Sequence, residues 1–110
     1  RWIVRPHSAE VLRSLAGAVG MGVPLDRGLD LFVSSSNPMV VQRRMATVRL
    51  AISHGEPCWQ VLAREGFLKD REVVLIEAAQ RAGNLPWALN TLADNLDRRL
   101  NFRIIAALEV

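Results

Sequence analysis

Three short breaks between aliphatic stretches constrain the fold of this chain more than any other feature. They consist of Gly22 and Pro24, of Gly55 and Pro57, and of Gly83, Asn84 and Pro86. Glycine ends a helix because it adopts the left-handed cap conformation without steric cost. Proline is tolerated in a first turn because its missing N–H would have no partner there. Each break therefore predicts that one helix ends and another begins within a few residues, which makes the two helices lie side by side.

Aliphatic residues recur at helical spacing on both sides of each break. The expected buried positions are, in chain order, Val11, Leu12, Leu15, Ala16 and Val19; Leu25, Leu29 and Phe32; Val41, Met45, Val48 and Ile52; Trp59, Leu62 and Ala63; Leu75, Ala78, Ala79 and Ala82; and Leu85, Leu89, Leu92, Leu96 and Leu100. The residues placed to cap helices through side-chain oxygens are Ser8, Asn37, Asp70 and Asn84. The sequence therefore predicts an all-α fold over residues 8–103, a six-helix bundle built from three antiparallel helical hairpins, with residues 1–7 as a linker.

The composition agrees with one helical domain. The chain has 110 residues, of which 50% are hydrophobic and only 5% aromatic. A chain of this length is expected to fold around a single core. The single cysteine, Cys58, excludes an internal disulfide and is compatible with a reducing compartment.

The last residues leave two interpretations open. Residues 104–110 are largely apolar and follow Arg98, Arg99 and Arg103. Arginines before an apolar helix match the positive-inside bias of cytoplasmic flanks, so one hypothesis is a helix that continues toward a transmembrane segment. The other is the end of an amphipathic helix. The chain contains no apolar run of about 18 residues, the length that a membrane span needs.

The titratable residues form no recognisable catalytic or metal-binding pattern. His7 and His54 have no partner at the spacing of a catalytic or metal site. Asn90, Asp94 and Asp97 share roughly one helix face, but a hard cation needs about six oxygen ligands. We therefore expect no enzyme activity and no cofactor, with a divalent cation as a minor alternative.

The candidate binding residues are Arg43, Arg44 and Arg49, which fall off the aliphatic stripe of their helix. Arginine suits an acidic protein surface, because its planar fork pairs bidentately with carboxylates. With a net charge of +3, the chain could alternatively contact the phosphates of a nucleic acid. Acidic residues are interspersed, however, and no platform of aromatic and basic residues occurs, so we expect a protein partner and no nucleic acid. Trp59 and Trp87 each stand near the start of a helix, and we interpret both as packing at the edge of the core.

The order of these motifs resembles one known family. The residues that carry the resemblance are Leu12-Arg13-Ser14-Leu15-Ala16 followed by Gly22-Val23-Pro24-Leu25 and Gly28-Leu29, then Gly55, Pro57 and Val61-Leu62, and finally Ala79-Gln80-Arg81-Ala82-Gly83-Asn84-Leu85 with Leu89, Leu92 and Ala93. They are similar to the cytoplasmic helical domain of the type II secretion system F / type IV pilus (PilC-like) inner-membrane platform family. The match covers about residues 8–105. One departure concerns the family's Gly-Glu pair, which is Ala79-Gln80 here, so any role of that glutamate does not carry over.

The resemblance implies a non-enzymatic scaffold on the cytoplasmic face of the bacterial inner membrane. In such a platform the expected partners are the secretion or pilus assembly ATPase and other inner-membrane platform proteins, and the parent chain is a membrane-embedded homo-oligomer. Family members usually carry two copies of this domain. The resemblance leaves open which copy this is and whether it serves secretion or pilus assembly.

Overall fold

The computed structural model describes residues 5–33 and 38–109 of the chain. A short 3-10 helix, Arg5–His7, precedes α1 (Ser8–Gly20), α2 (Leu25–Val33), α3 (Met39–Ser53), α4 (Cys58–Arg64), α5 (Asp70–Arg81) and α6 (Leu85–Glu109). The described residues contain no strand. The predicted all-α fold with six helices is therefore confirmed.

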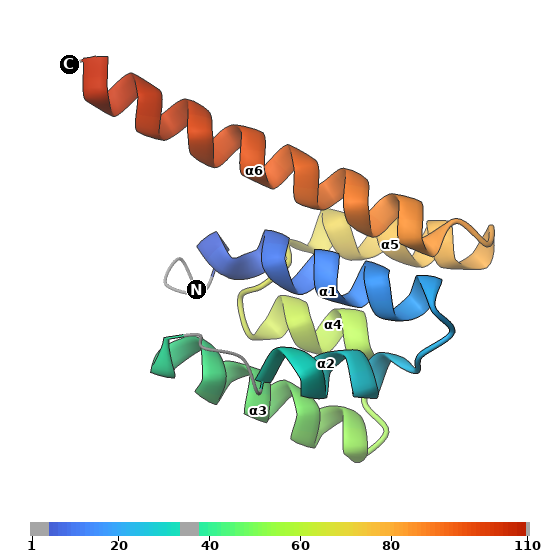
Figure 1. Cartoon of the computed structure of the whole chain (residues 1–110). Helices are drawn as coiled ribbons and strands as arrows, with labels where there is room; N and C mark the ends of the chain where they lie inside the picture. Colours follow the sequence, from blue (N-terminus) through green and yellow to red (C-terminus); the bar gives the residue numbers. More distant parts are fainter. Residues whose placement is uncertain (1–4, 34–37, 110) are drawn as a thin grey trace.

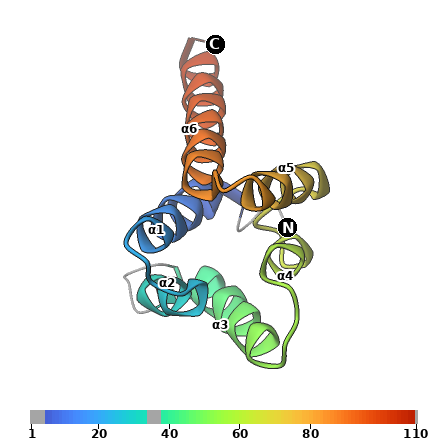
Figure 2. The same ribbon diagram turned by 90° about the vertical axis from the view of Figure 1, so that its right-hand side faces the viewer.

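The six helices form a ring in which each helix packs against its neighbours in the chain, and α6 packs back against α1. Figures 1 and 2 show this arrangement from the side and along the ring axis. The pairing of α1 with α6 is the most extensive of all. Three separate antiparallel hairpins are not confirmed, because each helix contacts both neighbours and the largest interface joins the first helix to the last.

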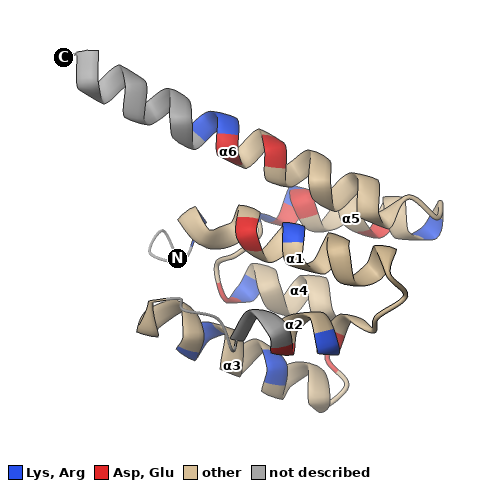
Figure 3. Cartoon of the chain, in the orientation of Figure 1, with Lys and Arg blue, Asp and Glu red and all other residues tan. Residues whose placement is uncertain are grey.

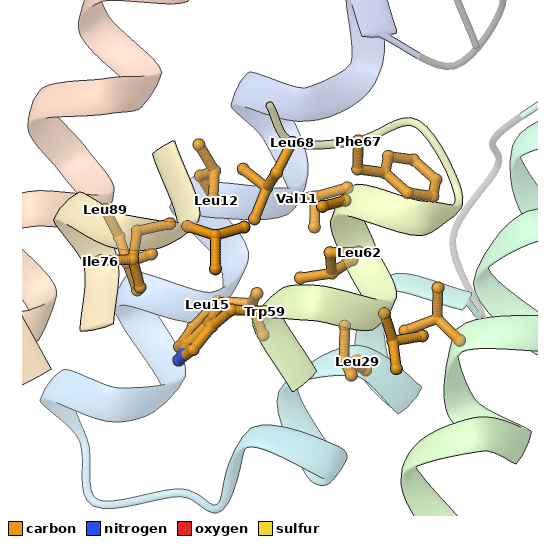
Figure 4. Close-up of a cluster of buried hydrophobic side chains, with 14 of the residues drawn as sticks. Val11, Leu12, Leu15, Leu29, Trp59, Leu62, Phe67, Leu68, Ile76 and Leu89 are labelled. Atoms are coloured by element: carbon orange, nitrogen blue, oxygen red, sulfur yellow. The ribbon is translucent and has the colours of Figure 1, made fainter. Parts of the chain in front are cut away.

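The core lies inside this ring and draws side chains from all six helices. Figure 4 shows Leu12 and Leu15 of α1 facing Trp59 of α4, with Ile76 of α5 and Leu89 of α6 beside them. All five side chains are buried. Trp59 is thus a central core residue, as its place in the predicted aliphatic pattern indicated, and our interpretation of it as packing at the edge of the core is wrong.

Most of the predicted stripes are confirmed. The positions that the structure buries are Val11, Leu12, Leu15, Ala16, Leu29, Val41, Met45, Val48, Trp59, Leu62, Ala63, Leu85 and Leu89. Partly buried positions packed against this core are Val19, Leu25, Ile52, Leu92 and Leu96. The side chains of Phe32 and Leu100 lie outside the described residues.

The predicted stripe of α5 is wrong. Leu75, Ala78 and Ala82 are exposed, and the helix buries Val73 and Ile76 instead. Residues 73–76 are four consecutive aliphatics, so helical periodicity fits two different faces of this segment. The alanines of the predicted stripe match helical spacing, but each has little apolar surface to bury. The larger Val73 and Ile76 therefore face the core.

The glycine breaks have the geometry that the sequence predicted. Gly22, Gly55 and Gly83 have φ values of +77°, +88° and +79°. After each one, the next backbone N–H donates to the carbonyl five residues earlier, as from Asn84 to Ala79 at 2.8 Å. This is the Schellman motif, which satisfies the carbonyls left unpaired at a helix end.

A fourth joint of the same kind lies between α4 and α5, in addition to the three glycine–proline breaks. Gly66 has φ +95°, and the Phe67 N–H donates to the Leu62 carbonyl at 2.9 Å. No proline follows Gly66 in the sequence, so the glycine–proline criterion passed over it. The joint turns the chain from α4 into α5 and buries Phe67.

The predicted caps need correction. Ser8 is the first residue of α1, and its hydroxyl donates to the Phe67 carbonyl at 2.5 Å instead of capping the helix. Asp70 is likewise inside α5, where Glu72 accepts a hydrogen bond from the Lys69 N–H at 2.7 Å. Glutamate at the third helical position can satisfy the cap N–H in this way.

The other two predicted caps are Asn84 and Asn37. Asn84 directly precedes α6, and its backbone carbonyl accepts the Ala88 N–H at 3.1 Å. Asn37 lies outside the described residues.

α6 is continuous from Leu85 to Glu109. None of the described helices combines the length and the hydropathy that crossing a bilayer requires. The continuation of residues 104–110 toward a membrane stays a prediction.

Candidate functional site

The three predicted binding arginines lie on α3 but do not form one free basic face. Arg44 makes an ion pair with Glu65 at 3.5 Å, and Arg49 makes one with Asp30. Arg43 is exposed, and its guanidinium has no ion pair within the part of the chain that the structure describes. Arg44 and Arg49 therefore connect α3 to its neighbours, and Arg43 alone is free to bind a partner.

Apolar side chains flank Arg43 on the outer face of α3. Met39 is 63% exposed and Leu50 is 60% exposed. Together with the exposed residue Ala46 they stand at helical spacing around Arg43, on the side opposite the buried Met45. We call Met39, Arg43, Ala46 and Leu50 the α3 stripe. The sequence analysis missed its apolar members, although their four-residue and three-residue spacing was available as a signal.

Neither charge pattern nor geometry favours nucleic acid at this face. Figure 3 shows basic and acidic residues interspersed along the helices. Two of the three arginines already pair with carboxylates, and large apolar side chains occupy the positions beside the third. A phosphate-binding surface would instead gather several unpaired cations.

A second polar cluster fastens the start of the domain. The Arg5 guanidinium donates to both Glu72 carboxylate oxygens at 2.8 Å and to the Phe67 carbonyl at 2.8 Å. Glu72 is a buried residue. The described part of the segment that we predicted to be a linker is therefore a helical turn fixed to the joint between α4 and α5.

The environment of Glu72 changes its protonation. Burial raises the pKa of this carboxyl, whereas the hydrogen bonds from Arg5 and from the Lys69 N–H, together with the positive charge of Arg5, lower it. The lowering effects win, so the pKa of Glu72 lies below its ordinary value. The carboxylate is ionised at neutral pH and forms a charge-assisted pair with Arg5.

The remaining candidates for chemistry have structural roles. Asp94 and Asp97, considered above for a cation, pair with Arg13 at 2.9 Å and 2.5 Å. No group of three or more His, Cys, Asp or Glu residues that could hold a metal occurs among the described residues. Burial raises the pKa of the Cys58 thiol to about 12, which keeps it protonated and a poor nucleophile.

The residue that replaces the family's glutamate also has a packing role. The amide oxygen of Gln80 accepts a hydrogen bond from the Trp59 indole Nε1 at 3.1 Å. A buried indole N–H requires such a partner. Gln80 therefore joins α5 to the tryptophan at the centre of the core.

Trp87 contradicts the sequence interpretation. It lies in the first turn of α6 and is 68% exposed, so it is not a core residue. The core side of this turn is already occupied by Leu85, Ala88 and Leu89. Trp87 stands on the opposite side of the helix, since it is about 160° away from Leu89 at 100° per residue.

An open groove of about 430 Å³ runs between α4 and α5. Ala63, Val73 and Val74 form its apolar part, and Gln60 and Glu77 stand among its polar lining residues. The Gln60 Nε2 donates to the Glu77 carboxylate at 3.1 Å. The groove therefore combines apolar and polar lining residues, as a shallow binding surface does.

Comparison with known proteins identifies the family. The family model described as type II secretion system (T2SS), protein F, matches residues 11–109. A type II secretion system protein F from Xanthomonas campestris pv. campestris is 29% identical over an alignment of 99 residues, and the alignment covers 87% of this chain and 24% of that protein. The chain thus spans about a quarter of the curated relative that it matches. Because the family model covers nearly all of the helical ring, the chain belongs to the type II secretion system protein F family.

Proposed function

We propose that this domain is a non-enzymatic scaffold that holds other components of a secretion machinery on the cytoplasmic face of the inner membrane. The expected partners are the assembly ATPase and other inner-membrane platform proteins, and the parent chain is membrane-embedded and homo-oligomeric. Family membership supports the secretion role. The partly buried, protonated Cys58 thiol and the paired carboxylates of Asp94 and Asp97 support a scaffold more than a reaction centre.

The α3 stripe is the observation that carries the binding role. It places one unpaired guanidinium, that of Arg43, between the exposed apolar side chains of Met39 and Leu50. Apolar contact supplies affinity, and a bidentate arginine–carboxylate pair fixes orientation. This combination suits an acidic protein surface with apolar pockets.

The membrane connection is a second part of the proposal. α6 extends without a break to Glu109 and carries Arg98 and Arg99 before its last turns. A cluster of arginines next to a membrane-spanning helix marks the cytoplasmic side. We propose that the chain continues from α6 toward a transmembrane segment, which fusions of a topology reporter to the parent protein after Glu109 would test.

The ATPase interaction is tested by reversing the charge of the α3 stripe. Arg43→Glu should weaken capture of the cognate assembly ATPase by about tenfold or more, corresponding to roughly 1.4 kcal/mol of binding free energy. Leu50→Asp should have the same effect, because it places a charge among apolar contacts. Both side chains are exposed, so circular dichroism and the unfolding midpoint should stay unchanged.

Arg27→Glu on α2 is the matched control, since Arg27 is also an exposed arginine and lies on a different helix. It should leave ATPase capture within about twofold, a difference of roughly 0.4 kcal/mol. Capture that survives both α3 substitutions would show that the ATPase does not bind at the α3 stripe.

A further inference from the structure

α5 is apolar on two faces, and only one of them packs against the core. Val73 and Ile76 are buried, whereas Val74 is 63% exposed and Leu75 is 57% exposed. The exposed residues Ala78 and Ala82 continue the outer face at helical spacing. We call Val74, Leu75, Ala78 and Ala82 the α5 stripe. No described element covers it.

Two arginines without partners stand at the ends of the α5 stripe. Arg71 and Arg81 are exposed, and neither guanidinium takes part in an ion pair or hydrogen bond within residues 5–33 and 38–109. Glu77 stands one turn before Arg81 but is engaged by Gln60 across the groove. The ten residues from Arg71 to Arg81 rise about 15 Å along the helix. The surface is therefore an apolar stripe with a positive charge at each end.

The groove between α4 and α5 borders this stripe. Val74 belongs to both, so the apolar surface is continuous from the outer face of α5 into the groove. Ala63 and Val73 extend the apolar part of the groove toward α4. A side chain of a docked helix could enter here beside Val74, as the anchor residues of an amphipathic helix do in a helix-binding groove.

We propose that the outer face of α5 binds an amphipathic helix of a partner protein that carries carboxylates near both ends of its apolar side. The carboxylates would lie about 15 Å apart, matching Arg71 and Arg81. Each could form a bidentate pair with a guanidinium, and the leucine-like residues between them would cover Val74 and Leu75.

The same charges argue against a second copy of this chain at the α5 stripe. If two copies of α5 packed together, in either direction, an arginine at each end would face an arginine of the other copy. Like charges that face each other across an interface cost binding free energy. The α5 stripe is also separate from the α3 stripe, so this proposal does not depend on the proposed function.

A designed peptide serves as the probe. It is a 16-residue capped helical peptide with leucines along one face and two glutamates ten residues apart at the ends of that face. A second peptide carries lysines in place of the glutamates. Titration of the glutamate peptide into the ¹⁵N-labelled 110-residue chain should give saturable amide shifts confined to α4 and α5. The lysine peptide should bind at least tenfold more weakly.

Variants of the chain complete the test. The double variant Arg71→Glu/Arg81→Glu should lose at least tenfold in affinity for the glutamate peptide and gain affinity for the lysine peptide. Leu75→Asp should abolish binding. Trp87→Ala, which removes an equally exposed apolar side chain from α6, should leave the affinity within twofold. Circular dichroism checks that each variant is folded.

Three results would overturn the proposal. Equal binding of both peptides would remove the role of the two arginines. Amide shifts outside α4 and α5 would place the peptide elsewhere. Self-association of the chain that Leu75→Asp abolishes would show that a second copy covers the stripe. The peptide titrations test the α5 stripe alone, and ATPase capture by Arg43→Glu and Leu50→Asp tests the α3 stripe alone. One proposal can therefore fail while the other stands.

Discussion

Arg5 and Glu72 illustrate how single residues fix the start of this domain. Arg5 approaches from the turn before α1, and Glu72 lies in the first turn of α5, yet their charged groups meet at 2.8 Å. The same carboxylate accepts the Lys69 N–H. One buried side chain thus pairs a cation and caps a helix.

Glu72 should make the stability of the domain depend on pH. Its pKa is lower in the folded state, so its contribution is fully present above the unfolded pKa of about 4.3 and is lost as the pH falls through the folded value. At pH 7, Glu72→Gln should lower the free energy of unfolding by about 1–3 kcal/mol. Urea unfolding of the wild-type chain and of Glu72→Gln should show the difference in unfolding free energy shrinking between about pH 5 and about pH 3, where Glu72 becomes protonated.

Glu10→Gln is the control for this measurement. Glu10 is exposed in the first turn of α1, and its loss should change the free energy of unfolding by less than about 0.5 kcal/mol. A difference for Glu72→Gln that stays constant down to pH 3 would mean that the ion pair with Arg5 does not contribute.

The binding arginines show where sequence reasoning stops at this scale. Periodicity correctly places Arg43, Arg44 and Arg49 off the buried side of α3, because that depends only on local spacing. Which of them is free depends on Glu65 and Asp30, which belong to other parts of the chain. Such contacts are set by tertiary packing, so the sequence could not separate Arg43 from the other two.

The joints between helices belong to the scale of the element. Gly22, Gly55, Gly66 and Gly83 all have positive φ values. Only glycine takes this conformation without a steric cost, and the hydrogen bonds that close the joints involve residues near in sequence. Joints of this kind are therefore predictable from the sequence.

The buried face of α5 could not be predicted from the sequence. Val73–Ile76 offers two apolar faces, and tertiary packing decides which of them is buried.

A pair of glycine substitutions tests the joints. Gly66→Ala should destabilise the domain by about 1–2 kcal/mol, because alanine is strained at positive φ. Gly17→Ala should instead stabilise it by about 0.5–1 kcal/mol, since Gly17 lies inside α1 and an added Cβ meets nothing within 4 Å. Thermal unfolding of the two variants gives the comparison, and equal effects would contradict this account of the joint.

On the scale of the whole molecule, the contact between α1 and α6 closes the ring. The two helices are far apart in the sequence, and no periodicity predicts that they meet. The sequence predicts six helices and most of their buried faces, but the ring depends on long-range packing around Leu15, Trp59 and Leu89. The family resemblance, in contrast, was visible in the order of the motifs and is confirmed.

Leu89→Ala should show that this closure supports the whole domain. Leu89 is fully buried in α6, and its truncation should cost about 2–5 kcal/mol of unfolding free energy. If the ring unfolds as one unit, far-UV circular dichroism and the fluorescence of Trp59, measured with Trp2 and Trp87 replaced by Phe, should report the same midpoint. A normal midpoint for α1–α5 with only α6 lost would contradict a common core. Leu75→Ala on the exposed face of α5 is the control and should cost less than about 0.5 kcal/mol.

The closure of α1 against α6 has a mechanical consequence. The two helices run in opposite directions, and the start of α1 and the far end of α6 point toward the same side of the molecule. Tension applied between the start of α1 and the end of α6 would peel the pair apart turn by turn, instead of sliding one helix along the other. Peeling breaks few contacts at a time, so this interface would be the first to yield under load.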